Sequence, residues 1–309
     1  MQAIRVHQFG GLDSLVAEDV PRPAPGDGEV LLRVKAAGVG PWDAWIRSGR
    51  SVLPQPLPLT LGSDVSGLVE QVGAGVSRFT AGEAVFGATN ARFTGGYAEY
   101  AVAAATKLAK MPHRLGFVEA ASVPVVACTA WQMVFEHGEV DATKRILVHG
   151  AAGNVGAYAT QLARRVAHDV VATALSDEVA YVQTLGVNRI VDVQKSRFED
   201  ELADVDVVLD TIGGDTQDRS FAVLKPGGVL VSAVSAPDQQ KAARHRVRAL
   251  FFLVEVSSAR LERIAALIED GELATNVGDV LPLAEARIAH EMLAGKPHKR
   301  GKIVLRVDD

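Results

Sequence analysis

Residues 145–156, RILVHGAAGNVG, combine residue types and spacing that could bind a dinucleotide. The aliphatic start predicts a strand that leads directly into Gly150, Gly153 and Gly156, and helix-forming residues follow. In such a unit the glycines let the backbone approach a pyrophosphate, and the N–H groups of the helix's first turn attract its charge. The usual G-x-G-x-x-G string is altered, because Ala151 stands at its first position. A tight strand-to-helix turn needs glycine for steric reasons alone, so the string by itself leaves a purely structural turn open.

Two blocks of predicted elements surround this turn. Up to about residue 115 the chain shows short strand patterns punctuated by glycine and proline, which favours a compact barrel-like sheet. Beyond it, strands alternate with helices, which predicts a doubly wound parallel sheet. The predicted strands of this second block are 145–149, 169–173, 189–192, 205–210, 228–233 and 248–253. A helical run at 258–270 should close this block, and the strand-like tail at 302–307 should complete the first sheet.

The composition excludes several classes of protein. The chain has 309 residues, 48% of them hydrophobic and 22% charged, which is typical of a folded globular protein with room for two domains. Its net charge of −5 offers no attraction to nucleic acid or to an anionic membrane. No signal peptide or membrane span is apparent, and the single cysteine, Cys128, excludes an internal disulfide. We therefore expect a cytoplasmic protein that binds neither nucleic acid nor membrane.

An ordered series of motifs extends over nearly the whole chain. It runs PGDGEVLLRVKAAGV, LGSDVSGLVEQVGAGV, GGYAEYAV, HGAAGNVG, VDVVLDTIGG, LKPGGVLV and RGKIVL. In this order and spacing the chain resembles the zinc-independent medium-chain dehydrogenases/reductases of the quinone oxidoreductase (zeta-crystallin-like) branch. The resemblance implies an α/β fold, with a GroES-like β-barrel catalytic domain over 1–117, completed by 272–309, and a Rossmann domain over 118–271. It also implies a cofactor in the cleft between them and NADPH-dependent reduction of quinones or activated alkenes.

The zinc-type alcohol dehydrogenases provide a test within this superfamily. They resemble this fold but carry a cysteine in the first catalytic loop and a His-Glu pair after the proline-rich loop. Gly40 and the pair Ser63–Asp64 stand at the matching positions here. A structural zinc site needs about four ligands, usually cysteines, and a catalytic site about three. We therefore expect no zinc.

The residues at the end of the second strand of this block should determine whether the cofactor carries a 2′-phosphate, as NADPH does, or lacks it, as NADH does. An NAD-preferring unit places Asp or Glu about 20 residues past the glycines, but Thr173 and Ala174 stand there. The missing carboxylate favours NADPH over NADH. The family often has a lysine nearby, at the position matched by Val179, whereas Asp177 and Glu178 precede that position. These acids oppose a phosphate, so NADH stays open as the alternative.

By resemblance the cofactor-binding residues lie on a helix, on the glycine turn and after successive strands. We expect them to be Thr129, Gly150, Ala151, Ala152, Gly153, Asn154, Val155, Thr173, Ser176, Thr211, Ile212, Gly213, Val234, Ser235, Phe252 and Leu253. Thr173 and Ser176 would donate hydrogen bonds, although Ser176 could equally cap the following helix.

Residues 38–50, GVGPWDAWIRSGR, are predicted to form the wall of the reaction site. The family pattern resembles N-P-x-D-x-x-x-R-x-G, in which Gly40 replaces the asparagine and Trp45 stands where relatives often show tyrosine. Loss of both donors predicts a more apolar, aromatic pocket. The catalytic candidates are Trp42, Asp43, Trp45 and Tyr97. Asp43 could act as a general acid only with a raised pKa, and we expect it instead to brace the site through Arg47 or another basic group. Core packing is the alternative for both tryptophans.

The predicted activity is therefore zinc-free NADPH-dependent reduction of a quinone or another α,β-unsaturated carbonyl. Two alternatives stay open: an enal or enoyl-thioester reductase, for which a basic cluster at Lys296, His298, Lys299 and Arg300 could meet thioester phosphates, and a low-turnover NADPH-binding sensor or structural protein. We also expect a homodimer, formed by edge pairing of the last strand of the second block, around 248–255.

Overall fold

The computed structural model describes residues 1–307, and the chain divides into two compact units. Unit 1 comprises Met1–Val125 and the part of the chain from Glu255 onward, and unit 2 comprises Val126–Val254. The unit that contains the parallel sheet is shorter at both ends than the range 118–271 expected for the Rossmann domain from the sequence. Helix α9 (Ser258–Glu269) accounts for most of the difference, because Ser258 Oγ donates to the carbonyl oxygens of Ala105 and Leu108 at 3.1 and 2.6 Å. This helix therefore packs on unit 1.

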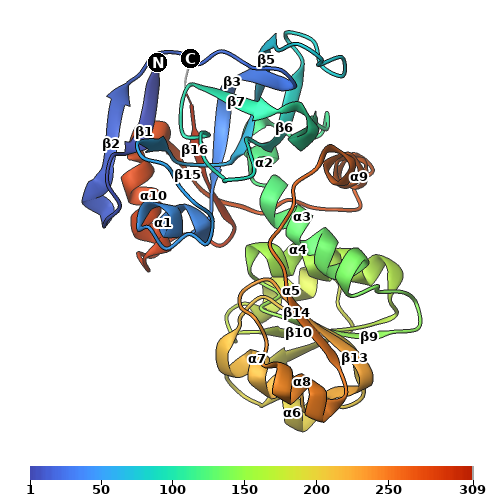
Figure 1. Cartoon of the computed structure of the whole chain (residues 1–309). Helices are drawn as coiled ribbons and strands as arrows, with labels where there is room; N and C mark the ends of the chain where they lie inside the picture. The colour runs from blue at the N-terminus through green and yellow to red at the C-terminus, as the bar shows by residue number, and fades with distance from the viewer. Residues whose placement is uncertain (308–309) are drawn as a thin grey trace. The chain divides into compact units, whose positions relative to one another are not determined.

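Unit 1 is built on a seven-stranded sheet, with a smaller three-stranded sheet beside it (Figure 1). In the larger sheet the order is β15-β16-β3-β5-β6-β8, and β7 also pairs with β3. These strands are β3 (Glu29–Val39), β5 (Asp64–Val72), β6 (Ala84–Ala88), β7 (Tyr100–Ala104), β8 (Leu108–Lys110), β15 (Val277–Pro282) and β16 (Lys302–Arg306). The smaller sheet is β2-β1-β4, made of β1 (Gln2–Val6), β2 (Leu15–Asp19) and β4 (Leu59–Thr60).

The C-terminal strand lies inside the larger sheet of unit 1. β16 pairs antiparallel with β3, with Ile303 opposite Val39, and parallel with β15. Its apolar residues join the core of the unit, since Ile303, Val304 and Leu305 are at most 3% exposed. The helices of this unit include α1 (Pro41–Arg47), α2 (Phe117–Ala121) and α10 (Ala286–Leu293).

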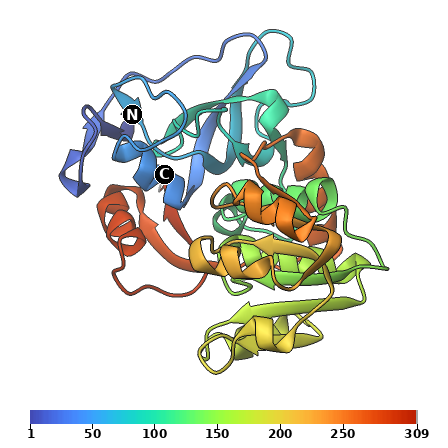
Figure 2. The same cartoon turned by 60° about the horizontal axis from the view of Figure 1, so that its bottom comes forward.

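Unit 2 is a six-stranded parallel sheet in the order β11-β10-β9-β12-β13-β14. The strands are β9 (Arg145–His149), β10 (Asp169–Ala174), β11 (Arg189–Asp192), β12 (Val205–Asp210), β13 (Leu224–Ser232) and β14 (Arg248–Phe251). Helices α4 (Asn154–Val166) and α5 (Val179–Thr184) cover one face, and α6 (Phe198–Glu201), α7 (Gly214–Ser220) and α8 (Gln239–His245) the other (Figure 1, Figure 2). The doubly wound sheet expected from the alternation is confirmed. Because both faces are covered, the central strand is a continuous apolar run, and Ile146, Leu147 and Val148 are fully buried.

The helical segment before β9 is interrupted just before Pro124. Helix α2 ends at Ala121, and α3 (Pro124–Trp131) begins with Pro124 and continues into the π-helical turn η3 (Gln132–His137). Proline is accepted at a helix start because its missing N–H needs no partner there. None of the helices within residues 1–307 is long and apolar enough to cross a lipid bilayer.

Candidate active site

The glycine turn of unit 2 has the geometry that its sequence predicts. Gly150 adopts φ +68°, which favours glycine, and Gly153 precedes the first residue of α4. A Cβ at Gly156 would lie 2.1 Å from the carbonyl oxygen of Gly150, so the helix can approach the turn this closely only with glycine there. Ala151 and Ala152 are buried, whereas Asn154 and Val155, in the first turn of α4, are partly exposed. The helix therefore presents its N-terminus at the carboxyl edge of the sheet, where an anion would bind.

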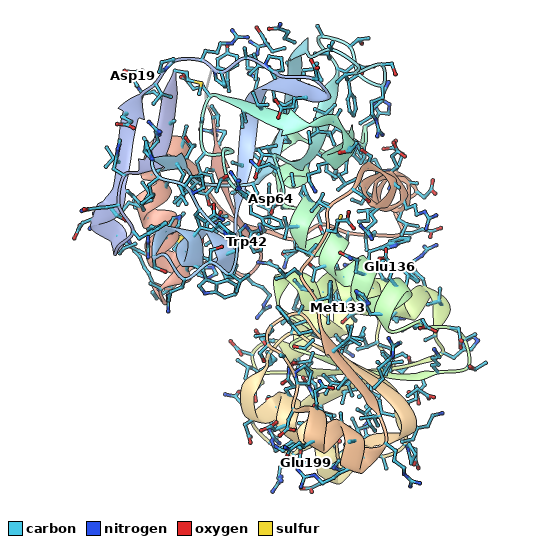
Figure 3. The ribbon with its side chains drawn as sticks, viewed as in Figure 1. Asp19, Trp42, Asp64, Met133, Glu136 and Glu199 are labelled. Carbon is cyan, nitrogen blue, oxygen red and sulfur yellow. The ribbon has the colours of Figure 1, made fainter. Side chains whose placement is uncertain are left out.

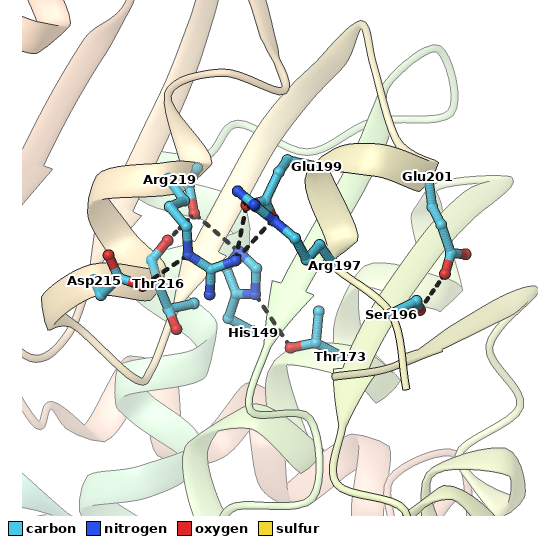
Figure 4. A network of polar contacts seen from close by, with 10 residues as sticks. His149, Thr173, Ser196, Arg197, Glu199, Glu201, Asp215, Thr216 and Arg219 are labelled. Carbon is cyan, nitrogen blue, oxygen red and sulfur yellow. Dashed lines mark hydrogen bonds and ion pairs between the residues drawn. The ribbon is translucent and has the colours of Figure 1, made fainter. Parts of the chain in front are cut away.

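A buried hydrogen-bonded chain holds this turn in place (Figure 4). Ser220 Oγ donates to the carbonyl oxygen of Thr216 at 2.7 Å and lies 2.9 Å from His149 Nε2, so this nitrogen donates to it. Burial lowers the pKa of His149 to about 4, which leaves the ring neutral at pH 7 and Nδ1 as an acceptor. The hydroxyl of Thr173 donates to Nδ1 at 3.1 Å and accepts from the N–H of Gly150 at 3.2 Å.

The expected role of Thr173 therefore changes. Its side chain is 4% exposed, and its hydroxyl proton is committed to His149. Thr173 braces the glycine turn from inside the unit, and the geometry does not offer it as a hydrogen-bond donor to a cofactor. The hydroxyl of Thr211, the residue after β12, is committed in the same way, because it donates to the carbonyl oxygen of His149 at 2.7 Å.

A second buried acceptor orders the loop after β12. Each carboxylate oxygen of Asp210 accepts two hydrogen bonds at 2.8–3.0 Å. The N–H groups of Ile212 and Gly213 donate to Oδ1, and the Gln217 amide and the Ser232 hydroxyl donate to Oδ2. Gly213 adopts φ +76° beside them. The role of this aspartate was not expected from the sequence, although a carboxylate followed by T-I-G-G at a strand end is a detectable signal for a tight turn.

Apolar side chains are exposed at the carboxyl edge of the same sheet. Ile212, Val234 and Leu253, each expected to touch the cofactor, are 53%, 41% and 54% exposed. Ser235 lies 3.4 Å from the Gln217 amide, and the Phe252 ring packs against His137 with 4.5 Å between ring centroids. Thr129, on α3, is 7% exposed. In open parallel sheets ligands bind at this edge, so the exposed apolar residues are in the right place for a ring system.

In unit 1 the catalytic candidates separate into buried and exposed groups. Asp43 and Tyr97 are fully buried; Asp43 Oδ2 accepts from the Tyr97 hydroxyl at 2.9 Å and from the N–H of Gly40 at 2.8 Å. Burial raises the pKa of Asp43 to about 7. Trp45 is 47% exposed and Trp42 partly exposed. Tyr97 therefore has a structural role, since its hydroxyl is buried against Asp43. The two tryptophans are the remaining candidates to contact a substrate.

Of the two partners expected for Asp43, Arg47 or another basic group, Arg47 is not the one, and the positive charge that acts on Asp43 is that of Lys302. Arg47 Nη1 lies 3.2 Å from Nδ1 of His290 on α10, and burial followed by the Arg47 charge lowers the pKa of His290 to about 4. The edge of the Tyr97 ring faces the same histidine, with centroids 6.2 Å apart. Asp43 and Arg47, one turn apart on α1, thus contact different residues of unit 1, Asp43 the Tyr97 hydroxyl and Arg47 the His290 ring of α10.

A buried lysine provides the positive charge of this site. Lys302 Nζ, on β16, lies 2.9 Å from Asp64 Oδ2, and the two side chains are 1% and 0% exposed. The ammonium also lies 4.2 Å from the centroid of a Trp42 ring, close enough for a cation–π interaction. Trp42 and Asp64, the two partners of this ammonium, are labelled in Figure 3. Asp64 Oδ1 accepts from the N–H of Val125 at 3.0 Å. Gly38 makes room for the pair, since a Cβ there would lie 3.0–3.1 Å from both side chains and 2.4 Å from the Ala121 carbonyl oxygen.

Comparison with known proteins identifies the family. Residues 26–113 match the alcohol dehydrogenase GroES-like domain, and residues 185–305 match the family described as zinc-binding dehydrogenase. The chain is 31% identical to the quinone oxidoreductase of Pongo abelii, over 99% of this chain and 97% of the relative. This chain belongs to the quinone oxidoreductase branch of the medium-chain dehydrogenases/reductases. It is therefore an oxidoreductase, and its family implies a nicotinamide cofactor.

Solved structures support the same assignment. The quinone oxidoreductase of Coxiella burnetii superposes with a TM-score of 0.91 at 30% identity, covering 100% of this chain and 99% of that one. A protein described as an NAD-dependent alcohol dehydrogenase gives a TM-score of 0.90 at 30% identity, with complete coverage of both chains. A mycobacterial protein complexed with NADPH gives 0.87 at 29% identity over 99% of each chain. Unit 1 is accordingly the GroES-like domain and unit 2 the Rossmann domain of this oxidoreductase.

The residues of this family member do not fit a catalytic zinc. Across residues 1–307 no three side chains of His, Cys, Asp or Glu converge on one point. Asp64, at a position matching a zinc ligand, is already paired with the Lys302 ammonium. A divalent cation beside that ammonium would be repelled, and an ammonium has no lone pair to donate. The buried cation of this site is a lysine side chain.

Proposed function

We propose that this oxidoreductase transfers hydride from a reduced nicotinamide dinucleotide to a quinone or another α,β-unsaturated carbonyl, without zinc. The Lys302–Asp64 ion pair is the observation that carries the proposal. Oxidation of a simple alcohol in this fold would need a Lewis acid to hold the alkoxide. A conjugated acceptor needs none, because the electron pair that arrives with the hydride is delocalised onto its own oxygen. The quinone oxidoreductases among the relatives support this choice.

The bound dinucleotide supplies the hydride, and the chain's residues supply binding and orientation. The N-terminus of α4 and the turn at Gly150 receive the pyrophosphate. Trp42 and Trp45 offer aromatic surface to a flat acceptor, and the buried Lys302 ammonium lies 4.2 Å from the centroid of a Trp42 ring. Hydride addition to a quinone gives a hydroquinone anion, which takes its proton from water. Asp43 and Tyr97, both fully buried, move no proton in this scheme.

The sequence favours NADPH, and a similar chain is known in complex with NADPH. The choice between NADPH and NADH depends on the residues that face the ribose 2′ position.

The test is oxidation of NADH and NADPH, each followed with 1,4-benzoquinone, 9,10-phenanthrenequinone, an enal and crotonyl thioester. We expect turnover of the quinones, unchanged by a chelator or by added zinc. Turnover of the thioester alone would instead favour the thioester reductase. The structure offers little support for that alternative, because Lys296 of the basic cluster pairs with Glu291 at 3.0 Å and is not free to bind a thioester's phosphates. Tight dinucleotide binding with no turnover would select a sensor or structural role. Zinc-dependent alcohol oxidation would refute the proposal.

We propose in addition that two copies of the chain pair through β14. This strand forms one edge of the parallel sheet, and within residues 1–307 it pairs only with β13. Leu250 and Ala249 at this edge are partly exposed, and an open apolar edge is a template for strand pairing. Light scattering after gel filtration should give twice the mass of the 32.7 kDa chain. A monomer at micromolar concentration would contradict this interface.

A further inference from the structure

The carboxyl ends of β10 and β11 lie side by side in unit 2. The two strands are parallel, and Ala174, the last residue of β10, is the register partner of Asp192, the last residue of β11. In Rossmann domains the end of the second strand is where a carboxylate meets the adenosine ribose hydroxyls. Here the second strand lacks an acid, but the third strand supplies one in the same register.

Asp192 is held in place by several donors. Ser176 Oγ donates to its two oxygens at 2.9 and 2.7 Å, Lys195 Nζ lies 2.7 Å from Oδ2, and the N–H of Gln194 donates at 3.1 Å. The side chain of Asp192 is 13% exposed, whereas that of Lys195 is 74% exposed. The Lys195 and Ser176 hydrogen bonds lower the pKa of Asp192, so it is a fixed negative charge at pH 7.

The neighbouring backbone donors are also occupied. The N–H of Leu175 donates to the carboxylate of Glu178 at 3.0 Å, and that of Ser176 donates to the Gln194 amide oxygen at 3.0 Å. These N–H groups directly follow β10, the strand whose end faces the adenosine ribose in Rossmann domains. Their acceptors are side chains of the protein, one of them charged. A 2′-phosphate would therefore meet two carboxylates, Glu178 and Asp192, and one lysine that is already paired.

A cavity lined by Val193, the residue after Asp192, has the size of a small-ligand site. Its volume is about 390 Å³, and it is lined by Val193, Ser196, Arg197, Phe198, Asp215 and Arg219. Both arginines are already paired with Glu199, at 2.6 and 2.8 Å (Figure 4). The charges of this cavity are thus neutralised internally, and it adds no unpaired positive charge for a phosphate.

We propose that Asp192, oriented by Ser176, reads the ribose 2′-hydroxyl and rejects a 2′-phosphate, so that the chain binds NADH more tightly than NADPH. The hydroxyl donates to the carboxylate, whereas a phosphate brings like charge and no donor. This inference rests on the proposed dinucleotide site and reverses the preference expected from the second strand alone. The expectation of NADPH considered only the end of β10, whereas Asp192 stands at the end of the neighbouring strand β11.

The experiment measures the dissociation constants of NADH and NADPH by titration calorimetry, which needs no turnover. We expect the ratio of the NADPH constant to the NADH constant to be about tenfold or more in the wild type. Asp192→Asn should lower this ratio about tenfold, since it removes the repulsion and weakens the acceptor. Asp200→Asn, an exposed aspartate on neighbouring α6, is the matched control and should leave the ratio unchanged. Ser176→Ala should lower the ratio by a smaller factor, because it removes only the orientation of Asp192.

ADP-ribose and its 2′-phosphate, which lack the nicotinamide, should repeat the same preference. Tighter NADPH binding by the wild type, or an unchanged ratio in folded Asp192→Asn, would overturn the inference while leaving the reductase intact. If Asp192→Asn fails to fold, Ser176→Ala decides. Failure to bind any of the four ligands would overturn the proposed function as well.

Discussion

Replacing Asp43 with asparagine should remove a pH dependence of stability that the wild-type chain carries. Asp43 is fully buried, and its Oδ2 accepts from Gly40 and Tyr97 while Oδ1 has no hydrogen-bond partner within residues 1–307. Asparagine has nearly the same shape, and its carbonyl oxygen can accept the same two hydrogen bonds. It cannot ionise, so it isolates the free energy associated with the charge.

The sign and size follow from the pKa of Asp43, which burial raises from 3.8 to about 7. A carboxyl whose pKa is raised by folding contributes stability that is complete below 3.8 and is lost as the pH rises through about 7. Between pH 5 and pH 7.5 the wild type should therefore lose about 2.5 kcal/mol relative to Asp43→Asn. Above about pH 8 the difference should stay constant.

The assay is urea unfolding at a series of pH values, analysed as the difference in free energy of unfolding between wild type and variant. His149 and His290 titrate in the opposite sense, because burial lowers the pKa of each to about 4. Both histidines are present in both proteins, so their contributions cancel in the difference. The exposed Asp27, also in unit 1, provides the control Asp27→Asn, which should show no such change. A difference between wild type and Asp43→Asn that does not vary with pH would refute the reasoning.

Three further predictions concern the two sites. Gly156→Ala should abolish dinucleotide binding measured by calorimetry, because its Cβ would lie 2.1 Å from the Gly150 carbonyl oxygen; wild-type affinity would contradict the steric argument. Lys302→Met should lower the free energy of unfolding by about 3–5 kcal/mol, since it leaves Asp64 buried without its counter-charge. Adding Asp64→Asn should recover part of that loss in the same urea titration, and a double variant no more stable than the single one would argue against the pair. Thr173→Val should destabilise unit 2 by about 1–3 kcal/mol and weaken NADH and NADPH binding equally. A changed ratio of their affinities would mean that Thr173 contacts the 2′ position.

Features that depend on neighbouring residues in the chain could be predicted from the sequence. The strand, the glycine turn and the helix at 145–166 form a local unit, and steric limits at Gly150 and Gly156 fix its shape. The parallel sheet followed from the same kind of local alternation. The helix at 258–269 was expected as well, but its partner was not, because its apolar face carries no information about which sheet it covers.

The polar contacts of the sites depend on tertiary structure and were predicted less well. Asp43 and Arg47 are four residues apart on one helix, a spacing that favours an ion pair. In the fold Asp43 meets Tyr97, and Arg47 meets His290, because burial of α1 brings closer partners to both. The Lys302–Asp64 pair joins strands from opposite ends of the sequence, and no local pattern indicates such a contact.

The position of β16 has a consequence for how the chain is made. Unit 2 is one continuous segment, Val126–Val254, so it can fold on the ribosome as soon as that segment has emerged. Unit 1 must wait, because β16 lies between β15 and β3 and brings Lys302 to Asp64. Until β16 is made, Asp64 lacks the Lys302 ammonium and the edge of β3 that β16 covers is unpaired. An unpaired strand edge can associate with other chains. We expect chaperone dependence during synthesis to fall on unit 1, although it is the first to be translated.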